Sequence, residues 1–220
     1  MKQIGITMRL AATIDIFGYW NRIRGAEIAP LRTQIEPNAV RHILASLFML
    51  EINKSGRVTF RLAGTRICDL FGRDLGGSSL SELWAHGNED IERTAMGVME
   101  HAIPTLLNVT GYSTAGHRTG FEIILLPLRS NEGHCNKVLG CIAPETAASW
   151  LEVVPLQFLA LDRSRLVYEQ LATPHEGTQD PKAADIAVAA RAPSITETLY
   201  LAMSNQRTEP AKADGPFRHS

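Results

Sequence analysis

In this chain of 220 residues, Glu122 is the carboxylate whose surroundings in the sequence are the most informative. It lies near the start of the apolar run Phe121-Glu-Ile-Ile-Leu-Leu-Pro-Leu128, which has the composition of a buried strand. An unpaired buried charge is very costly, so this carboxylate must face solvent or find a partner. Arg61, on an alternating segment, is one candidate. We interpret the two as a cross-strand ion pair that fixes sheet register, in preference to a ligand contact.

Histidines and cysteines are the other side chains that could bind a metal or a cofactor. His86 and His101 are the histidines considered as haem ligands, and an ordinary surface histidine is the simpler interpretation of each. A zinc site built from His134, Cys135 and Cys141 would lack an evident fourth ligand. A solvated loop and a small core thiol explain these three residues more simply, so no metal site is predicted.

The sequence motifs of the large enzyme classes are absent. The chain contains no Walker A loop, no G-x-G-x-x-G, no G-x-S-x-G and no H-E-x-x-H, and its cysteines lack C-x-x-C spacing. The titratable residues offer no convincing catalytic cluster. We therefore expect no enzymatic activity.

Composition and charge narrow the class of protein. Of all residues 45% are hydrophobic and 20% are charged, as in ordinary globular proteins. The 22 basic and 23 acidic residues leave a formal net charge of -1, so the chain lacks the basic excess that general nucleic-acid binding needs. Three cysteines argue against a disulfide framework and favour a reducing, cytoplasmic compartment. No apolar run is long enough to span a membrane.

An amphipathic helix is expected within residues 1–26. Leu10, Ile14 and Phe17 fall on one stripe of this helix at helical spacing, and Ile16, Trp20 and Ile23 lie beside it. The apolar face of such a helix must be buried, either on the body of the domain or in a dimer interface, and both roles stay open.

The body of the domain extends over residues 27–167. Val58, Phe60 and Leu62 alternate with polar residues, which is typical of a half-buried antiparallel strand. Two strands precede a helical insert and three follow it. This order favours an α+β fold with one five-stranded antiparallel sheet and helices on one face. The apolar segment 150–167 fits a last strand or a returning helix equally well.

Residues 168–220 differ in composition from the body. Five prolines are spread through sequence rich in Ala, Thr and Asp, which predicts a largely disordered tail. One island, residues 194–204, begins with the capping box Ser194-Ile-Thr-Glu197. It is interpreted as a short helix or a docking peptide, with a chance apolar cluster as the alternative.

A set of short motifs in the body resembles one known family. The motifs are Phe60-Arg-Leu-Ala-Gly-Thr65, Phe71-Gly-Arg-Asp-Leu-Gly-Gly77, Leu83-Trp84, Phe121-Glu122 leading to Leu126-Pro-Leu128, and Leu139-Gly140. In order and spacing they are similar to a PAS-domain family of small, mostly alphaproteobacterial proteins, formerly catalogued as a domain of unknown function, over residues 29–144. The resemblance implies a PAS fold. It also implies a sensory or regulatory module rather than an enzyme, acting through a protein partner or as a homodimer through its N-terminal helix or sheet face.

The resemblance also implies where a small ligand would lie, which is between the sheet and the helices. The expected lining of this pocket consists of inward-facing apolar residues: Val58, Phe60, Leu62, Leu83, Trp84, Ile91, Val98 and Met99. The same residues would fill an ordinary core if no ligand binds. Cys68 lies in Arg66-Ile-Cys-Asp-Leu-Phe71, which does not match the flavin-photoreceptor motif. The alternative functions are a haem- or flavin-binding redox or gas sensor and a small enzyme of unknown reaction.

Overall fold

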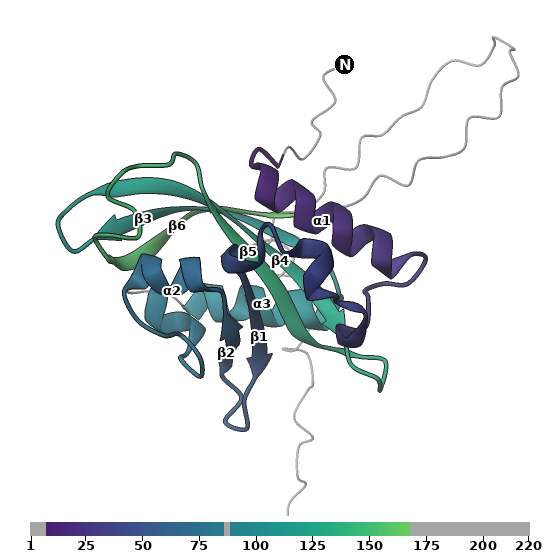
Figure 1. Ribbon diagram of the computed structural model, residues 1–220. Coiled ribbons are helices and arrows are strands. Elements are labelled where there is room, and N and C mark those ends of the chain that lie inside the picture. Colours follow the sequence, from purple (N-terminus) through teal and green to yellow (C-terminus); the bar gives the residue numbers. More distant parts are fainter. Residues whose placement is uncertain (1–7, 86–88, 168–220) are drawn as a thin grey trace, which may run out of the picture. The chain divides into compact units, whose positions relative to one another are not determined.

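The structure is a computed structural model, from which residues 8–85 and 89–167 are described (Figure 1). His86, the tail predicted for residues 168–220 and the segment 194–204 lie outside the described residues. No helix of the described part is both long and apolar enough to cross a membrane.

Three α-helices, a series of 3-10 turns and six strands make up the described chain. The helices are α1 (Ala11–Arg24), α2 (Thr65–Phe71) and α3 (Glu89–His101), and the 3-10 helices are η1 (Arg32–Gln34), η2 (Pro37–Val40), η3 (Leu44–Ser46) and η4 (Leu80–Leu83). The strands are β1 (Leu47–Ile52), β2 (Val58–Ala63), β3 (Thr105–Ser113), β4 (Arg118–Arg129), β5 (Cys135–Pro144) and β6 (Leu156–Leu166).

The strands form one sheet in the order β2-β1-β5-β4-β3-β6, and every neighbouring pair is antiparallel. The predicted α+β class with an antiparallel sheet is confirmed, but the sheet has six strands rather than five. The sixth, β6, comes from the segment 150–167, whose strand or helix character the sequence left open. It pairs with β3 along its length, with Leu166 opposite Thr105 at one end and Leu156 opposite Ser113 at the other.

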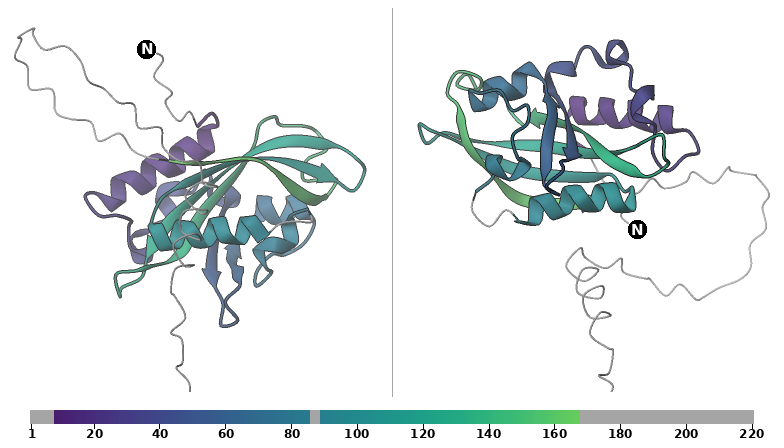
Figure 2. Two further views of the ribbon diagram at one scale, coloured as in Figure 1. Left: turned by 180° about the vertical axis from the view of Figure 1, so that it is seen from behind. Right: turned by 90° about the horizontal axis from the view of Figure 1, so that it is seen from below.

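Helices lie on both faces of the sheet (Figure 2), and each face carries its own cluster of buried apolar residues. On the inner face, α2, α3 and η4 pack against the sheet, and α3 contributes Ile91, Ala95 and Val98 at helical spacing. On the outer face, α1 packs across β4 and β5. The helix buries Ile16 and Trp20, whereas Ile14 is exposed. The helix thus packs on the body, which is one of the two roles that the sequence left open. It does so mainly through the second of the two expected stripes, that of Ile16 and Trp20.

A β-bulge in β2 changes which side chains face the inner core. Met49 pairs with Leu62 and Leu50 pairs with Phe60, so Arg61 is an extra residue on β2. Because such a residue interrupts the alternation, Ala63 packs on the inner core and Leu62 is 45% exposed. The structure corrects the expectation that Leu62 faces the same way as Val58 and Phe60.

Candidate functional site

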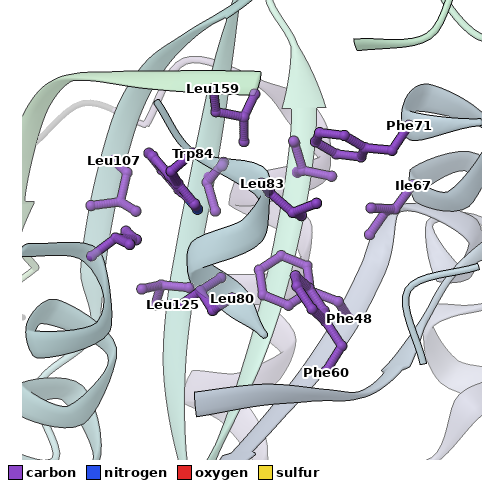
Figure 3. A pocket seen from close by; sticks show the side chains of 13 residues that line it. Phe48, Phe60, Ile67, Phe71, Leu80, Leu83, Trp84, Leu107, Leu125 and Leu159 are labelled. Atoms are coloured by element: carbon purple, nitrogen blue, oxygen red, sulfur yellow. The ribbon is translucent and has the colours of Figure 1, made fainter. Parts of the chain in front are cut away.

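An apolar cavity lies between the sheet and the helices of its inner face (Figure 3). Its volume is about 20 Å³. A site needs about 10–15 Å³ to hold one water molecule, so this cavity has room for about one. The described residues that line it are Phe48, Phe60, Ile67, Phe71, Leu80, Leu83, Trp84, Ile91, Leu107, Ile123, Leu125, Ile142 and Leu159.

The short helix η4 places two of these side chains, Leu80 and Leu83, and the chain then leads directly to Trp84. Its start is fixed by a capping box in which the Ser79 N–H donates to the Glu82 carboxylate at 3.0 Å. That hydrogen bond, aided by the Arg73 guanidinium, lowers the pKa of Glu82 below its ordinary value. The carboxylate is therefore charged at neutral pH and stabilises the turn that carries the cavity wall.

The indole N–H of Trp84 is the polar group of the cavity, because every other described lining side chain is a hydrocarbon. Trp84 is 8% exposed, and its Nε1 is buried with no hydrogen-bond partner among the described residues. Figure 3 shows this nitrogen directed toward the middle of the ring of lining side chains. Trp20, by contrast, donates its Nε1–H to the Pro127 carbonyl at 2.8 Å. An unpaired buried donor costs about 1–3 kcal/mol, so an acceptor placed beside Trp84 would recover that free energy.

Glu122 lies on the opposite face of the sheet and is completely buried. Its carboxylate accepts hydrogen bonds from the Arg9 N–H at 3.2 Å, from the Leu10 N–H at 3.3 Å and from the Thr13 hydroxyl. These donors lie at the N-terminus of α1, where Leu10 supplies no side-chain cap. A carboxylate is favourable there because it satisfies free N–H groups and complements the helix dipole. Glu122 therefore caps α1 from β4.

The predicted ion pair between Arg61 and Glu122 does not form. Arg61 is exposed on β2, and the strands β1 and β5 separate β2 from β4. The Glu122 carboxylate instead accepts hydrogen bonds from the start of α1. The sequence around Glu122 or Arg61 gives no sign of this contact.

Strand β4 joins the cavity to α1. Ile123 and Leu125 line the cavity from the inner face, whereas Glu122 and Ile124 pack with α1 on the outer face. Consecutive side chains of a strand point to opposite faces, so any shift of this strand reaches both.

The chain matches a family model described as a PAS domain over residues 8–143. It belongs to the PAS-domain family. The match confirms the family that the sequence motifs resemble, and it includes α1. No curated protein matches the sequence.

Solved structures similar to this PAS domain share little sequence with it. A light-oxygen-voltage domain is 16% identical, with 50% of this chain and 84% of that chain covered and a TM-score of 0.41. The PAS domain of a protein from Colwellia psychrerythraea is 14% identical, with coverage of 51% and 100% and a TM-score of 0.39. A light-oxygen-voltage protein of Rhodobacter sphaeroides is 11% identical, with coverage of 52% and 71% and a TM-score of 0.37.

Of the residues that the sequence suggested as the lining of the PAS pocket, some line the cavity in the structure and others do not. Phe60, Leu83, Trp84 and Ile91 line the cavity. The other buried members of the predicted set, Val58, Val98 and Met99, belong to the same core cluster without lining the cavity. The sequence interpretation missed the cavity residues of β1, of α2 and of β3 to β6, together with Leu80 of η4. Ile123 and Leu125 could have been found from the predicted strand itself, because alternate residues of a strand face the same side of the sheet; the strand was not divided into its two faces.

The described lining does not fit haem or flavin. None of the described lining residues carries an imidazole, thiol or thioether that could ligate haem iron, and His101 is exposed at the end of α3. A flavin ring needs several polar partners, whereas the described lining side chains offer one N–H. Within the described ranges no group of three or more His, Cys, Asp or Glu could hold a metal ion.

The Cys141 thiol lies in the outer core of this PAS domain and is 0% exposed. Burial raises its pKa to about 12, and the nearby carboxylates of Asp15 and Glu122 act in the same direction. An unfolded chain would lose this proton near pH 9. Folding stability from this group is therefore fully present below pH 9 and is lost as the pH rises toward 12.

We expect the free energy of unfolding, measured by urea titration, to fall across this alkaline range in the wild type. The fall should be smaller in Cys141→Ala, because this variant lacks the titrating thiol. Iodoacetamide at pH 8 should modify the partly exposed Cys68 in the native state and should reach Cys141 only when the protein unfolds. Rapid native-state labelling of Cys141 would contradict the assignment.

Proposed function

We propose that this PAS domain is a non-catalytic regulatory module in which occupancy of the core cavity changes how α1 is held on the sheet. The observation that carries the proposal is the double role of β4, with Ile123 in the cavity wall and Glu122 under the N-terminus of α1. Protein interiors are close-packed and transmit small displacements. A ligand that binds more tightly when β4 is displaced would therefore shift α1 between two arrangements.

The side chains of the core cavity and those around the buried Glu122 carboxylate support a regulatory rather than a catalytic role. The described cavity lining contains no titratable side chain. The buried Glu122 carboxylate already accepts hydrogen bonds from α1 and does not face the cavity. Neither region brings together the acid, base and nucleophile that turnover would need.

The partner contact is proposed for the part of the outer face that α1 leaves open. The helix packs on β4 and β5, while Tyr112 of β3 and Phe158 of β6 stack at 5.0 Å between ring centroids, both half-buried. Aromatic pairs of this kind are typical of interface cores, and one face meeting its own copy gives a two-fold dimer. We infer that a second copy of the chain is the first partner. A cytoplasmic location is also proposed, and the three free thiols support it.

Native mass spectrometry of freshly purified full-length protein tests the dimer and the bound molecule together. We expect a dimer that carries a small molecule in part of the population. Phe158→Glu should give monomers, because it places a charge in the interface, whereas Val153→Glu, at a side chain that is 76% exposed, should leave the dimer intact. A wild-type monomer at every concentration would contradict the dimer.

A further inference from the structure

We propose that the cavity takes a compact, neutral, largely apolar molecule with a single hydrogen-bond acceptor, and that the acceptor binds the Nε1–H of Trp84. The inference rests on the proposed sensory function and adds the chemical class of the ligand. It starts from Trp84 Nε1, a buried donor with no hydrogen-bond partner in the described part of the chain, in a cavity whose other described lining side chains are hydrocarbons.

Water does not match this site. A buried water molecule is held by two to four polar partners, and the described lining side chains offer one donor. A charged ligand matches still less, because a single N–H cannot replace the solvation of an ion in an apolar cavity. A molecule with several polar groups would leave all but one of them unpaired. The best match is therefore a hydrocarbon frame with one carbonyl, ether or hydroxyl oxygen.

The position of Trp84 is fixed by its backbone. The Trp84 N–H donates to the Ser81 carbonyl at 3.2 Å, and the next residue, Ala85, donates to the Leu159 carbonyl of β6 at 2.9 Å. The backbone of Trp84 is thus held to η4 on one side and to the sheet on the other, and the indole itself is 8% exposed among the cavity side chains. A donor held in place before the ligand arrives avoids the entropy cost of ordering it on binding.

The size of the cavity limits the ligand and links it to the signal. The cavity has room for about one water molecule, so a ring compound must push the lining apart. The aromatic rings of Phe48 and Phe60 meet edge to face at 5.6 Å, and Ile123 belongs to the strand that holds α1. A compact molecule displaces these walls slightly, and that displacement is the change proposed to reach α1.

The test uses the full-length protein labelled with ¹⁵N at its three tryptophan indoles, with signals assigned by single Trp→Phe substitutions. The probes are cyclopentanone and methylenecyclopentane, which have nearly the same shape but differ in the acceptor oxygen. We expect cyclopentanone to move the Trp84 N–H proton signal downfield and to bind roughly 3- to 10-fold more tightly than methylenecyclopentane. The Trp20 signal should stay in place, because its N–H is already bonded.

The remaining outcomes each decide the proposal. In Trp84→Phe, checked for folding by its spectrum, the two probes should bind equally. Equal binding to the wild type, or a cyclopentanone complex without a downfield Trp84 signal, would overturn the role of the donor. Failure of both probes to bind would overturn the ligand class. Neither result bears on the coupling between cavity and α1, which is measured without any ligand by the cavity-filling variant described in the Discussion.

Discussion

Glu122→Gln should lower the free energy of unfolding by about 2–3 kcal/mol. The substitution keeps the size of the side chain but removes its charge and replaces one acceptor oxygen with an NH₂ donor. The Arg9 and Leu10 N–H groups and the Thr13 hydroxyl all donate to Oε1, so the amide oxygen of Gln would keep that place without its charge. The NH₂ group would then replace Oε2 and face the Arg9 N–H, which donates to Oε2 in the wild type. Urea denaturation measures the loss. Amide exchange in the first turn of α1 should rise more than exchange in β5, because the cap is lost locally.

Glu145→Gln is the matched control. Glu145 also lies near the start of α1, where it pairs with the Arg9 guanidinium, but its side chain is 38% exposed. Exposed ion pairs contribute about 0–1 kcal/mol. Equal effects of the two substitutions would show that Glu122 holds α1 no more firmly than a surface contact does.

Gly140→Ala is the second substitution with a large expected effect. An added Cβ at this position of β5 would lie 2.1 Å from the Cζ atom of Phe48, whose ring packs flat over the glycine. The ring must move, and overpacking of this kind costs about 1–3 kcal/mol in the free energy of unfolding. Because Phe48 is part of the cavity wall, the variant should also alter the cavity.

A double-mutant cycle identifies the cause of that loss. In a Phe48→Leu background the Gly140→Ala substitution should cost less, because the clashing ring is absent. Gly18→Ala serves as a control glycine, since a Cβ there meets no atom within 4 Å and the residue lies inside α1. It should be neutral or stabilise the protein by up to about 1 kcal/mol. An unchanged cost of Gly140→Ala in the Phe48→Leu background would contradict the proposed contact.

The sequence predicted the antiparallel α+β fold and the family because its signals are local. Alternation in residues 58–62 and the short motifs need no knowledge of the tertiary structure. The bulge at Arg61 escaped prediction because alternation continues in the sequence where it stops in the structure. The segment 150–167 was ambiguous because its apolar residues suit a strand and a helix equally, and only pairing with β3 decides between them.

The site was less predictable because its parts are far apart in the chain. Glu122 meets donors more than 100 residues earlier, and no pattern around Glu122 points to the start of α1. The cavity lining draws on all six strands, so its composition depends on the strand order. Trp84 could be suggested from its motif, but its unpaired N–H is a property of the packed core.

Hydrogen–deuterium exchange of α1 in a cavity-filled variant tests the coupling most directly. Leu159→Phe places extra carbon in the cavity from β6, and Leu161→Phe adds the same group two residues along the same strand, at a side chain that is 39% exposed. We predict that Leu159→Phe speeds exchange in α1 above the wild-type rate, whereas Leu161→Phe leaves the exchange of α1 unchanged. A folded Leu159→Phe variant whose α1 exchanges at the wild-type rate would contradict the coupling of the cavity to α1.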